Sequence, residues 1–306
     1  MLATVFDKNF KPLGARRRKT KEFRGARQGL AGIAKTIEEA LADAGQQSRH
    51  LGGIGIGCPG VLNLVPGTIV HAPNLGWRNV PLTAALQRRF GCPVVIANDV
   101  DAGTYGEYRF GAGQKARCVL GVFPGTGIGA GLVYEGRLFR GRINSCMELG
   151  HIHMQAKGHL CGCGRWGCLE TVASRLAIAA EAAEAAYRGD APHLLENTGT
   201  DVAAIRSRAL ARAIDDGDRS VEAIVRHAAK YLGVAVTSVV NLLAPDVVVL
   251  GGGLMEALPA IFLHEVREAI RKQAMKPFRQ AVKVVAAVLE DEAGVLGAAA
   301  LAADAK

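Results

Sequence analysis

The sequence lacks any segment that would take the chain into or across a membrane. It shows no signal peptide, and no apolar run in it is long enough to span a bilayer. It also has no helix-turn-helix or DNA-binding zinc-finger pattern. The formal net charge of +9 therefore fits anionic substrates such as nucleotides as well as it fits nucleic acid. We expect a cytoplasmic protein with no membrane partner and no DNA-binding segment.

Two common nucleotide-binding motifs are also missing. No Gly-Lys-Ser/Thr occurs, which excludes a Walker A loop, and the run PGTGIGAGL at 124–132 lacks the helix and acidic partner of a dinucleotide fingerprint. This run follows a predicted strand at 117–123. Gly125 and Gly127 remove side chains on either side of Thr126, so backbone N–H groups and the Thr126 hydroxyl could reach a phosphate. A plain hairpin is the alternative, because hairpins use glycine too.

Cysteine is scarce, yet it is concentrated in one place. Of seven cysteines in 306 residues, Cys161, Cys163 and Cys168 fall within eight positions, with glycines at 162, 164 and 167 that allow sharp turns. Three thiolates and one imidazole make a closed tetrahedral Zn²⁺ site of the structural kind. A disulfide is the alternative, but it would leave one of the three cysteines unpaired.

Three histidines and two carboxylates surround these cysteines. His159 is only two residues from the first cysteine and would crowd the chelate, whereas His151 and His153 each leave a loop long enough to fold back. The spacing does not choose between those two. Glu148 and Glu170 bracket the cluster, and a metal that clamps the loop would fix both carboxylates. Rigid carboxylates suit the recognition of a polyol, whose hydroxyls donate hydrogen bonds.

Polar residues stand directly after a short apolar strand predicted at 93–97. Asn98 and Asp99 come next, and a helix is predicted at 100–108. The carboxyl end of a buried strand is where open α/β sheets bind their ligands. This position favours a catalytic role for Asp99. A helix N-cap is the alternative for the same residue.

A run of three glycines follows the β-branched strand predicted at 245–250. A side chain on Gly251, Gly252 or Gly253 would prevent a flat purine or ribose from packing on the backbone. A strand-to-helix turn that needs positive φ explains one of these glycines but not comfortably all three.

Hydrophobic periodicity and turn residues predict the remaining elements. The predicted strands are 2–6, 13–19, 51–57, 93–97, 117–123, 245–250 and 282–287. The predicted helices are 27–44, 100–108, 169–187, 201–213, 220–243, 259–273 and 290–303, with a surface loop at 188–200.

The segment around the cysteines resembles the signature of a known family. Glu-x-Gly-His, nine residues, then Cys-x-Cys-Gly-x-x-Gly-Cys-x-Glu is similar to the signature of the ROK family, which groups sugar kinases with sugar-responsive repressors. The resemblance implies that His151 is the histidine that binds zinc. The implied ligands are His151, Cys161, Cys163 and Cys168.

Other motifs along the chain resemble the same family, and the resemblance implies a role for each. Asp99 would be the general base. The implied sugar-binding residues are Gly60 of GCPGVLN, Asn74 of HAPNLGW, Asn98, Asp99, Glu148, His151 and Glu170. The implied ATP- and phosphate-binding residues are Gly125, Thr126, Gly127, Gly251, Gly252 and Gly253.

The implied fold is α/β, a two-lobed hexokinase–actin-like (ribonuclease H-like) ATPase fold. We expect a small lobe at 1–112 plus 290–306 and a large lobe at 113–289 that contains the zinc loop. The implied activity is ATP-dependent phosphorylation of the 6-hydroxyl of glucose or a related hexose, with Mg²⁺ bound to ATP and structural zinc. We also expect a homodimer or homotetramer, because the resemblance implies assemblies of that kind. The alternative is a non-catalytic sugar-binding regulator of the same family.

One departure from the family pattern lies at the start of the sequence. Kinases of this fold begin with a strand that leads into an Asp-x-Gly-Gly-Thr loop, which holds phosphate and whose aspartate works with Mg²⁺. This sequence begins with what resembles the second strand of that hairpin. We expect the full gene product to have about ten to fifteen further residues ahead of Met1, the length of one strand and its loop. Without them we expect weak ATP binding and slow turnover.

Overall fold

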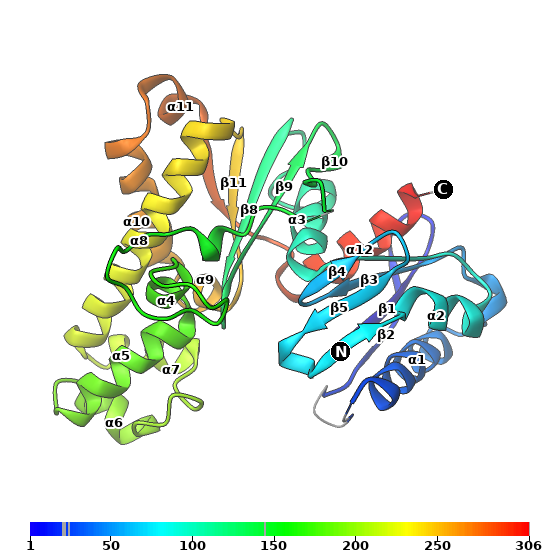
Figure 1. Ribbon diagram of the computed structural model, residues 1–306, viewed down its shortest axis with the longest axis horizontal. Coiled ribbons are helices and arrows are strands. Elements are labelled where there is room, and N and C mark those ends of the chain that lie inside the picture. Colours follow the sequence, from blue (N-terminus) through cyan, green and yellow to red (C-terminus); the bar gives the residue numbers. More distant parts are fainter. Residues whose placement is uncertain (20–22, 24, 144, 306) are drawn as a thin grey trace. The chain divides into compact units, whose positions relative to one another are not determined.

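The computed structural model describes residues 1–19, 23, 25–143 and 145–305, apart from the side chain of Asn74. These residues form two compact units, whose elements are labelled in Figure 1. Unit 1 contains residues 1–114, 136–146 and 291–306, and unit 2 contains residues 115–135 and 147–290. Residues 136–146, which the sequence analysis assigns to the large lobe, therefore group with unit 1.

Unit 1 is built from short sheets and the helices that pack against them. The predicted hairpin is present as β1 (Leu2–Phe6) and β2 (Pro12–Arg17), and strands β3 (Ile54–Cys58) and β7 (Val94–Asn98) pair in parallel. Unit 1 also contains a three-stranded antiparallel sheet and one helix that were not predicted from the sequence. These are β4 (Val61–Asn63), β5 (Thr68–Ala72), β6 (Trp77–Val80) and α2 (Leu82–Phe90). Helix α1 (Gly25–Asp43) confirms the prediction for 27–44.

The last helix of the chain packs at backbone contact within unit 1. A Cβ on Gly297 of α12 (Ala293–Asp304) would lie 1.8 Å from the carbonyl oxygen of Ala102 in α3 (Asp99–Phe110). A Cβ on Gly55 of β3 would likewise lie 1.8 Å from the carbonyl oxygen of Ala298. Glycine is therefore required at both crossings, and α12 fixes the position of helix α3.

Unit 2 is centred on a sheet whose strands run in the order β9 (Ile128–Tyr134), β8 (Cys118–Pro124), β11 (Val247–Leu250), β12 (Lys283–Ala286). Strands β8, β11 and β12 are parallel, and β9 runs antiparallel to β8. Every residue of β11 is buried, as expected of a parallel strand that helices cover on both faces. The short strand β10 (Arg137–Leu138) belongs to the residues of unit 1.

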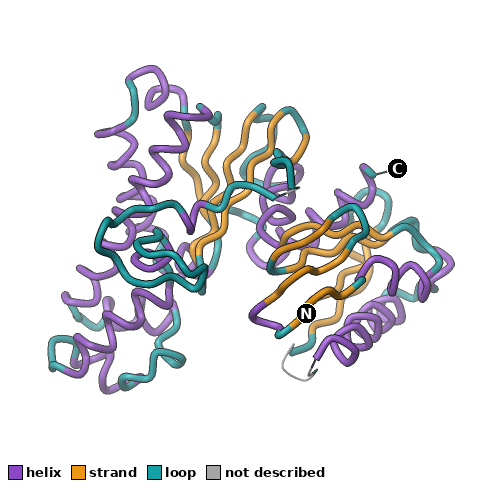
Figure 2. Tube along the Cα trace, in the orientation of Figure 1, coloured by secondary structure: helices purple, strands orange, loops and turns teal. Residues whose placement is uncertain are grey.

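Helices make up most of the rest of unit 2. They are α4 (Glu170–Ala173), α5 (Arg175–Tyr187), α6 (Pro192–Thr198), α7 (Ser207–Asp215), α8 (Arg219–Leu243), α9 (Gly253–Ala257), α10 (Pro259–Gln273) and α11 (Lys276–Ala281). Helices α8 and α10 pack against each other in the purple layer beside the orange strands of Figure 2. The predictions for α8 and α10 are confirmed.

Three predictions in this region are wrong. The single helix expected at 169–187 breaks at Ser174, which has ψ of 159° and whose hydroxyl accepts a hydrogen bond from the N–H of Ala177. The loop expected at 188–200 contains α6, which starts at Pro192, a residue well suited to the first turn of a helix. The helix expected to begin at residue 201 begins at Ser207.

Helix α8 also corrects the expectation that no segment could span a membrane. It is long and apolar enough to do so by length and composition alone. However, 61% of its most apolar window is buried inside the protein, so α8 serves here as a core helix.

Helix α12 offers a direct test of its glycine contact. Gly297→Ala should lower the free energy of unfolding by about 1–3 kcal/mol, because the new methyl group has no space against Ala102. Gly294→Ala is the matched control, since a Cβ there would meet nothing within 4 Å. It should be neutral or stabilising by up to about 1 kcal/mol. Urea denaturation of both variants measures the difference, and equal stability would contradict the contact.

Candidate functional site

Four side chains of unit 2 gather their ligand atoms at one point. The nitrogen and sulfur atoms of His151, Cys161, Cys163 and Cys168 all lie within 4.8 Å of one another. The distances from Cys161 Sγ to His151 Nδ1 and from Cys163 Sγ to Cys168 Sγ are both 3.6 Å. A tetrahedral zinc ion with Zn–S bonds of about 2.3 Å separates its sulfur ligands by about 3.8 Å. The cluster can therefore hold a metal ion with little movement.

A tight hairpin brings the cysteines together. The N–H of Cys161 donates to the carbonyl oxygen of Arg165 at 2.8 Å, and Leu160 pairs with Trp166 in an antiparallel bridge. Gly167 has φ of 74°, and a Cβ there would lie 1.9 Å from the carbonyl oxygen of Gln155. Glycine at 167 is therefore needed for both conformation and space.

The structure distinguishes the two histidines that spacing left open. His153 Nδ1 lies 3.0 Å from the carbonyl oxygen of Trp166, so this ring faces the main chain of the hairpin. His159 is exposed and lies outside the cluster. His151 is the histidine that faces the three sulfur atoms.

The electrostatics of the hairpin favour a thiolate at Cys163. The backbone N–H and the guanidinium of Arg165 both donate to this sulfur and lower the pKa of Cys163 to about 6. Arg165 also donates to the carbonyl oxygen of His151 at 3.2 Å. Because the thiolate is the form that binds metals, Arg165 prepares Cys163 for an ion. Burial raises the pKa of Cys161, and it raises that of Cys168 to about 12.

Glu170 links the metal hairpin to the glycine-rich turn. Its Oε2 accepts a hydrogen bond from the N–H of Ile128 at 2.9 Å, and its Oε1 lies 4.0 Å from Cys161 Sγ. A Cβ on Gly127 would lie 2.3 Å from Oε2. The absence of a side chain at Gly127 thus makes room for the Glu170 carboxylate. Glu148, the other bracketing carboxylate, is exposed, and its carbonyl oxygen accepts from the N–H of His151 at 2.9 Å.

The two glycine turns predicted to bind ATP lie next to each other in unit 2. Gly252 has φ of 83°, and a Cβ there would lie 3.0 Å from the carbonyl oxygen of Pro124, the residue before Gly125. A Cβ on Gly251 would lie 2.7 Å from the ring of Phe123, whereas the nearest atom at Gly253 is 3.6 Å away. Backbone conformation therefore requires glycine at 252 and packing requires it at 251, whereas a Cβ at 253 would make only an ordinary van der Waals contact.

In unit 1, the predicted base lies at the carboxyl end of two parallel strands. Cys58 of β3 pairs in register with Asn98 of β7, and Asp99 follows as the first residue of α3. Asn98 is the N-cap of this helix, because its Oδ1 accepts from the N–H of Val100 at 2.9 Å. Asp99 Oδ1 accepts from the same N–H at 3.1 Å. Because Asn98 already caps the helix, the capping role does not explain why residue 99 is an aspartate.

Solvent reaches the Asp99 side chain, but its surroundings alter its chemistry. Nearby protein atoms displace part of its water and raise the pKa of Asp99, an effect that the hydrogen bond from Val100 partly opposes. Burial, with a smaller contribution from the Asp99 charge, raises the pKa of Cys58 to about 12. Cys58 is therefore a neutral thiol beside the carboxylate.

Two other predicted sugar contacts also belong to unit 1. Gly60 has φ of 94°, and a Cβ there would lie 2.3 Å from the carbonyl oxygen of His71, so glycine is required. Asn74 stands in the short 3-10 turn Pro73–Leu75, and its side chain lies outside the described structure.

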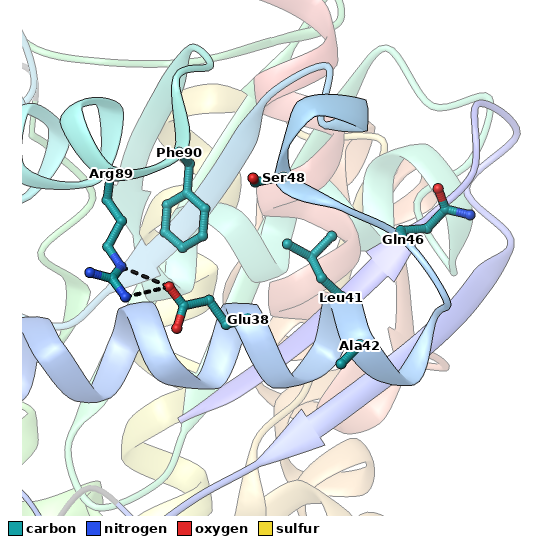
Figure 3. A pocket seen from close by; sticks show the side chains of 7 residues that line it. All are labelled: Glu38, Leu41, Ala42, Gln46, Ser48, Arg89 and Phe90. Atoms are coloured by element: carbon teal, nitrogen blue, oxygen red, sulfur yellow. Dashed lines mark hydrogen bonds and ion pairs between the residues drawn. The ribbon is translucent and has the colours of Figure 1, made fainter.

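A surface hollow in unit 1 contains none of the predicted residues. It has a volume of about 200 Å³ and lies between α1 and α2, lined by Leu41, Phe90 and the Glu38–Arg89 ion pair (Figure 3). The ion pair satisfies the charges that line the hollow. We assign no function to it.

Residues 1–305 match the sequence profile of the ROK family. The chain belongs to the ROK family. The xylose repressor of Caldicellulosiruptor bescii is 32% identical over 265 residues, which cover 87% of this chain and 66% of the repressor. The glucokinase of Halalkalibacterium halodurans is 33% identical over 269 residues, which cover 87% of this chain and 80% of the glucokinase. This ROK protein thus resembles both kinases and regulators.

A solved structure confirms the predicted fold class. The ROK glucokinase of Streptomyces griseus, in complex with glucose and AMPPNP, matches with a TM-score of 0.85 and 32% identity. The match covers 98% of this chain and 95% of that one. The hexokinase–actin-like α/β fold expected from the sequence is therefore correct.

The cluster of His151 and the three cysteines predicts that removing one of its thiolates weakens metal binding. Cys163→Ser replaces a thiolate by a hydroxyl, so it should weaken metal affinity by more than the roughly 10–100-fold typical of losing an outer hydrogen-bond partner. Elemental analysis and competition with a chromophoric chelator measure the affinity. Cys146→Ser, outside the cluster, is the control and should keep one metal per chain. Equal metal content in both variants would contradict the assignment.

Proposed function

We propose that this ROK protein is an ATP-dependent kinase of the 6-hydroxyl of glucose or a related hexose. The observation that supports it most is the position of Asp99, at the carboxyl end of β7, open to solvent and with a raised pKa. Parallel α/β sheets bind their ligands at that edge. The resemblance to glucokinases supports the choice of substrate.

In this proposal Asp99 accepts the proton of the sugar hydroxyl as its oxygen attacks the γ-phosphate of ATP. Mg²⁺, when bound with ATP, offsets the charge on the phosphates. The glycine turns at 125–127 and 251–253 bind the nucleotide. Hydroxyls and ring atoms of the sugar contact Gly60, Asn74, Asn98, Asp99, Glu148, His151 and Glu170.

We assign two tasks to His151. Its Nδ1 faces Cys161 Sγ at 3.6 Å, which suits coordination of a zinc ion. This arrangement leaves Nε2 for a sugar oxygen. Zinc is then structural: it orients the histidine and the hairpin and takes no part in phosphoryl transfer. We also propose a cytoplasmic homodimer or homotetramer.

A second candidate function is a sugar-binding regulator without kinase activity. The xylose repressor, 32% identical, favours it. Both functions predict sugar binding, so a coupled assay for ADP release distinguishes them. Glucose-dependent ADP release, even at a slow rate, supports the kinase. Sugar binding by calorimetry without any ADP release supports the regulator.

The role of Asp99 has its own test. Asp99→Asn keeps the size of the side chain but cannot take the proton, so kcat should fall by roughly 10²-fold or more while hexose affinity stays within a few-fold. Asp101→Asn, in the same helical turn, is the matched control and should keep turnover near that of the unmodified protein. Unchanged turnover in Asp99→Asn would move the base elsewhere.

The raised pKa of Asp99 predicts a pH effect. The base must be ionised to act, so kcat/KM should fall on acidification, with a midpoint above the roughly 3.9 of an ordinary aspartate. A pH–rate profile measures the midpoint. A profile flat down to the ordinary aspartate range would contradict the assignment.

A further inference from the structure

Two arginines of unit 2 lie beside the glycine-rich turn. Arg175, the first residue of α5, donates from Nη2 to the Thr126 hydroxyl at 3.4 Å. Its Nη1 donates to the carbonyl oxygen of Ile205 at 3.3 Å. Ile205 is followed by Arg206, the residue immediately before α7. The two cationic side chains therefore belong to one region of the surface, next to Thr126.

No carboxylate in the described part of the chain pairs with either arginine. Within residues 1–19, 23, 25–143 and 145–305, neither Arg175 nor Arg206 forms an ion pair, whereas Arg188 of the same unit pairs with both Glu184 and Asp190. Burial and the neighbouring charge of Arg206 lower the pKa of Arg175. Two like charges at close range are unfavourable unless an anion lies between them. The region thus has an electrostatic cost that a bound anion would remove.

The glycine-rich turn beside Arg175 also has backbone donors that form no hydrogen bond within the described structure. In the part of the chain that the structure describes, the N–H groups of Thr126 and Gly127 have no protein acceptor. Arg175 is the first residue of α5 and Arg206 is the N-cap of α7, and the amino end of a helix favours negative charge.

The second glycine turn completes the surroundings. Ser207 Oγ is the atom nearest to a Cβ position on Gly253, at 3.6 Å, and Gly252 adjoins Pro124. Arg206 precedes Ser207 in the chain and its charge acts on Arg175, so it is close to the turn at 251–253 and to the arginine beside Thr126. A ligand that spans the two turns would pass both arginines.

We infer that Arg175 and Arg206 bind the phosphate chain of a phosphoanhydride donor. The inference that this donor is a nucleoside polyphosphate rests on the proposed kinase function. Guanidinium groups suit this task because each presents paired N–H donors to phosphate oxygens. The two arginines thus contribute to the affinity for the phosphate chain in addition to the glycine turns.

The test compares Arg206→Gln with Arg188→Gln, a control that removes the same charge from the same unit. Binding of ADP, adenosine and inorganic tripolyphosphate is titrated by calorimetry on the metal-loaded full chain. Arg206→Gln should weaken the binding of ADP and of tripolyphosphate by about 10-fold or more, as expected for the loss of hydrogen bonds to charged groups. It should leave the affinities for adenosine and for hexose, titrated in the same way, unchanged. The control Arg188→Gln should leave the affinities for all four compounds unchanged.

The probes separate the possible sources of the phosphate chain. ADP bound much more tightly than tripolyphosphate identifies a nucleotide, and the reverse order identifies an inorganic chain; either supports the anion site. The anion site would be overturned if Arg206→Gln bound ADP and tripolyphosphate as tightly as the unmodified protein does. It would also be overturned if the unmodified protein bound neither compound. Phosphate binding that depends on Arg206, without hexose-dependent ADP release, would overturn the kinase function and leave the anion site intact.

Discussion

The Glu170 carboxylate connects two segments of unit 2 that are far apart in the sequence. One oxygen accepts the Ile128 N–H in the glycine-rich turn, and the other lies beside Cys161 Sγ in the metal hairpin. Glu170 follows the candidate ligand Cys168 by two residues, so an ion that holds Cys168 would also fix the start of α4. The space for this carboxylate exists because residue 127 is glycine. The position of the turn therefore depends on the metal hairpin.

The same dependence continues one helix further. After the bend at Ser174, the N–H of Arg175 donates to the carbonyl oxygen of Gly125 at 2.9 Å. The segment 170–175 thus holds the glycine-rich turn at both ends. A metal ion at the cysteines would act on the residues proposed to bind sugar and on those proposed to bind phosphate through one short piece of backbone.

The sequence predicts the parts of this arrangement that local patterns determine. The spacing of Cys161, Cys163 and Cys168 predicts a shared ligand point, and β-branched runs predict β8 and β11. Spacing could not choose between His151 and His153, because the choice depends on a hydrogen bond from the second ring to Trp166. The bend at Ser174 lies in an alanine-rich run that reads as continuous helix. The contact of Arg175 with Thr126 joins residues 49 positions apart, and no local pattern indicates it.

The central claim is that the metal hairpin holds the glycine-rich turn in place through Glu170. Hydrogen–deuterium exchange of the metal-loaded and chelator-treated protein tests it most directly. Removal of the metal should speed exchange in 124–132 as well as in 148–175, because the Ile128 amide loses its fixed acceptor, while β7 and α3 of unit 1 keep their protection. Unchanged protection of 124–132 after complete removal of the metal would contradict the account.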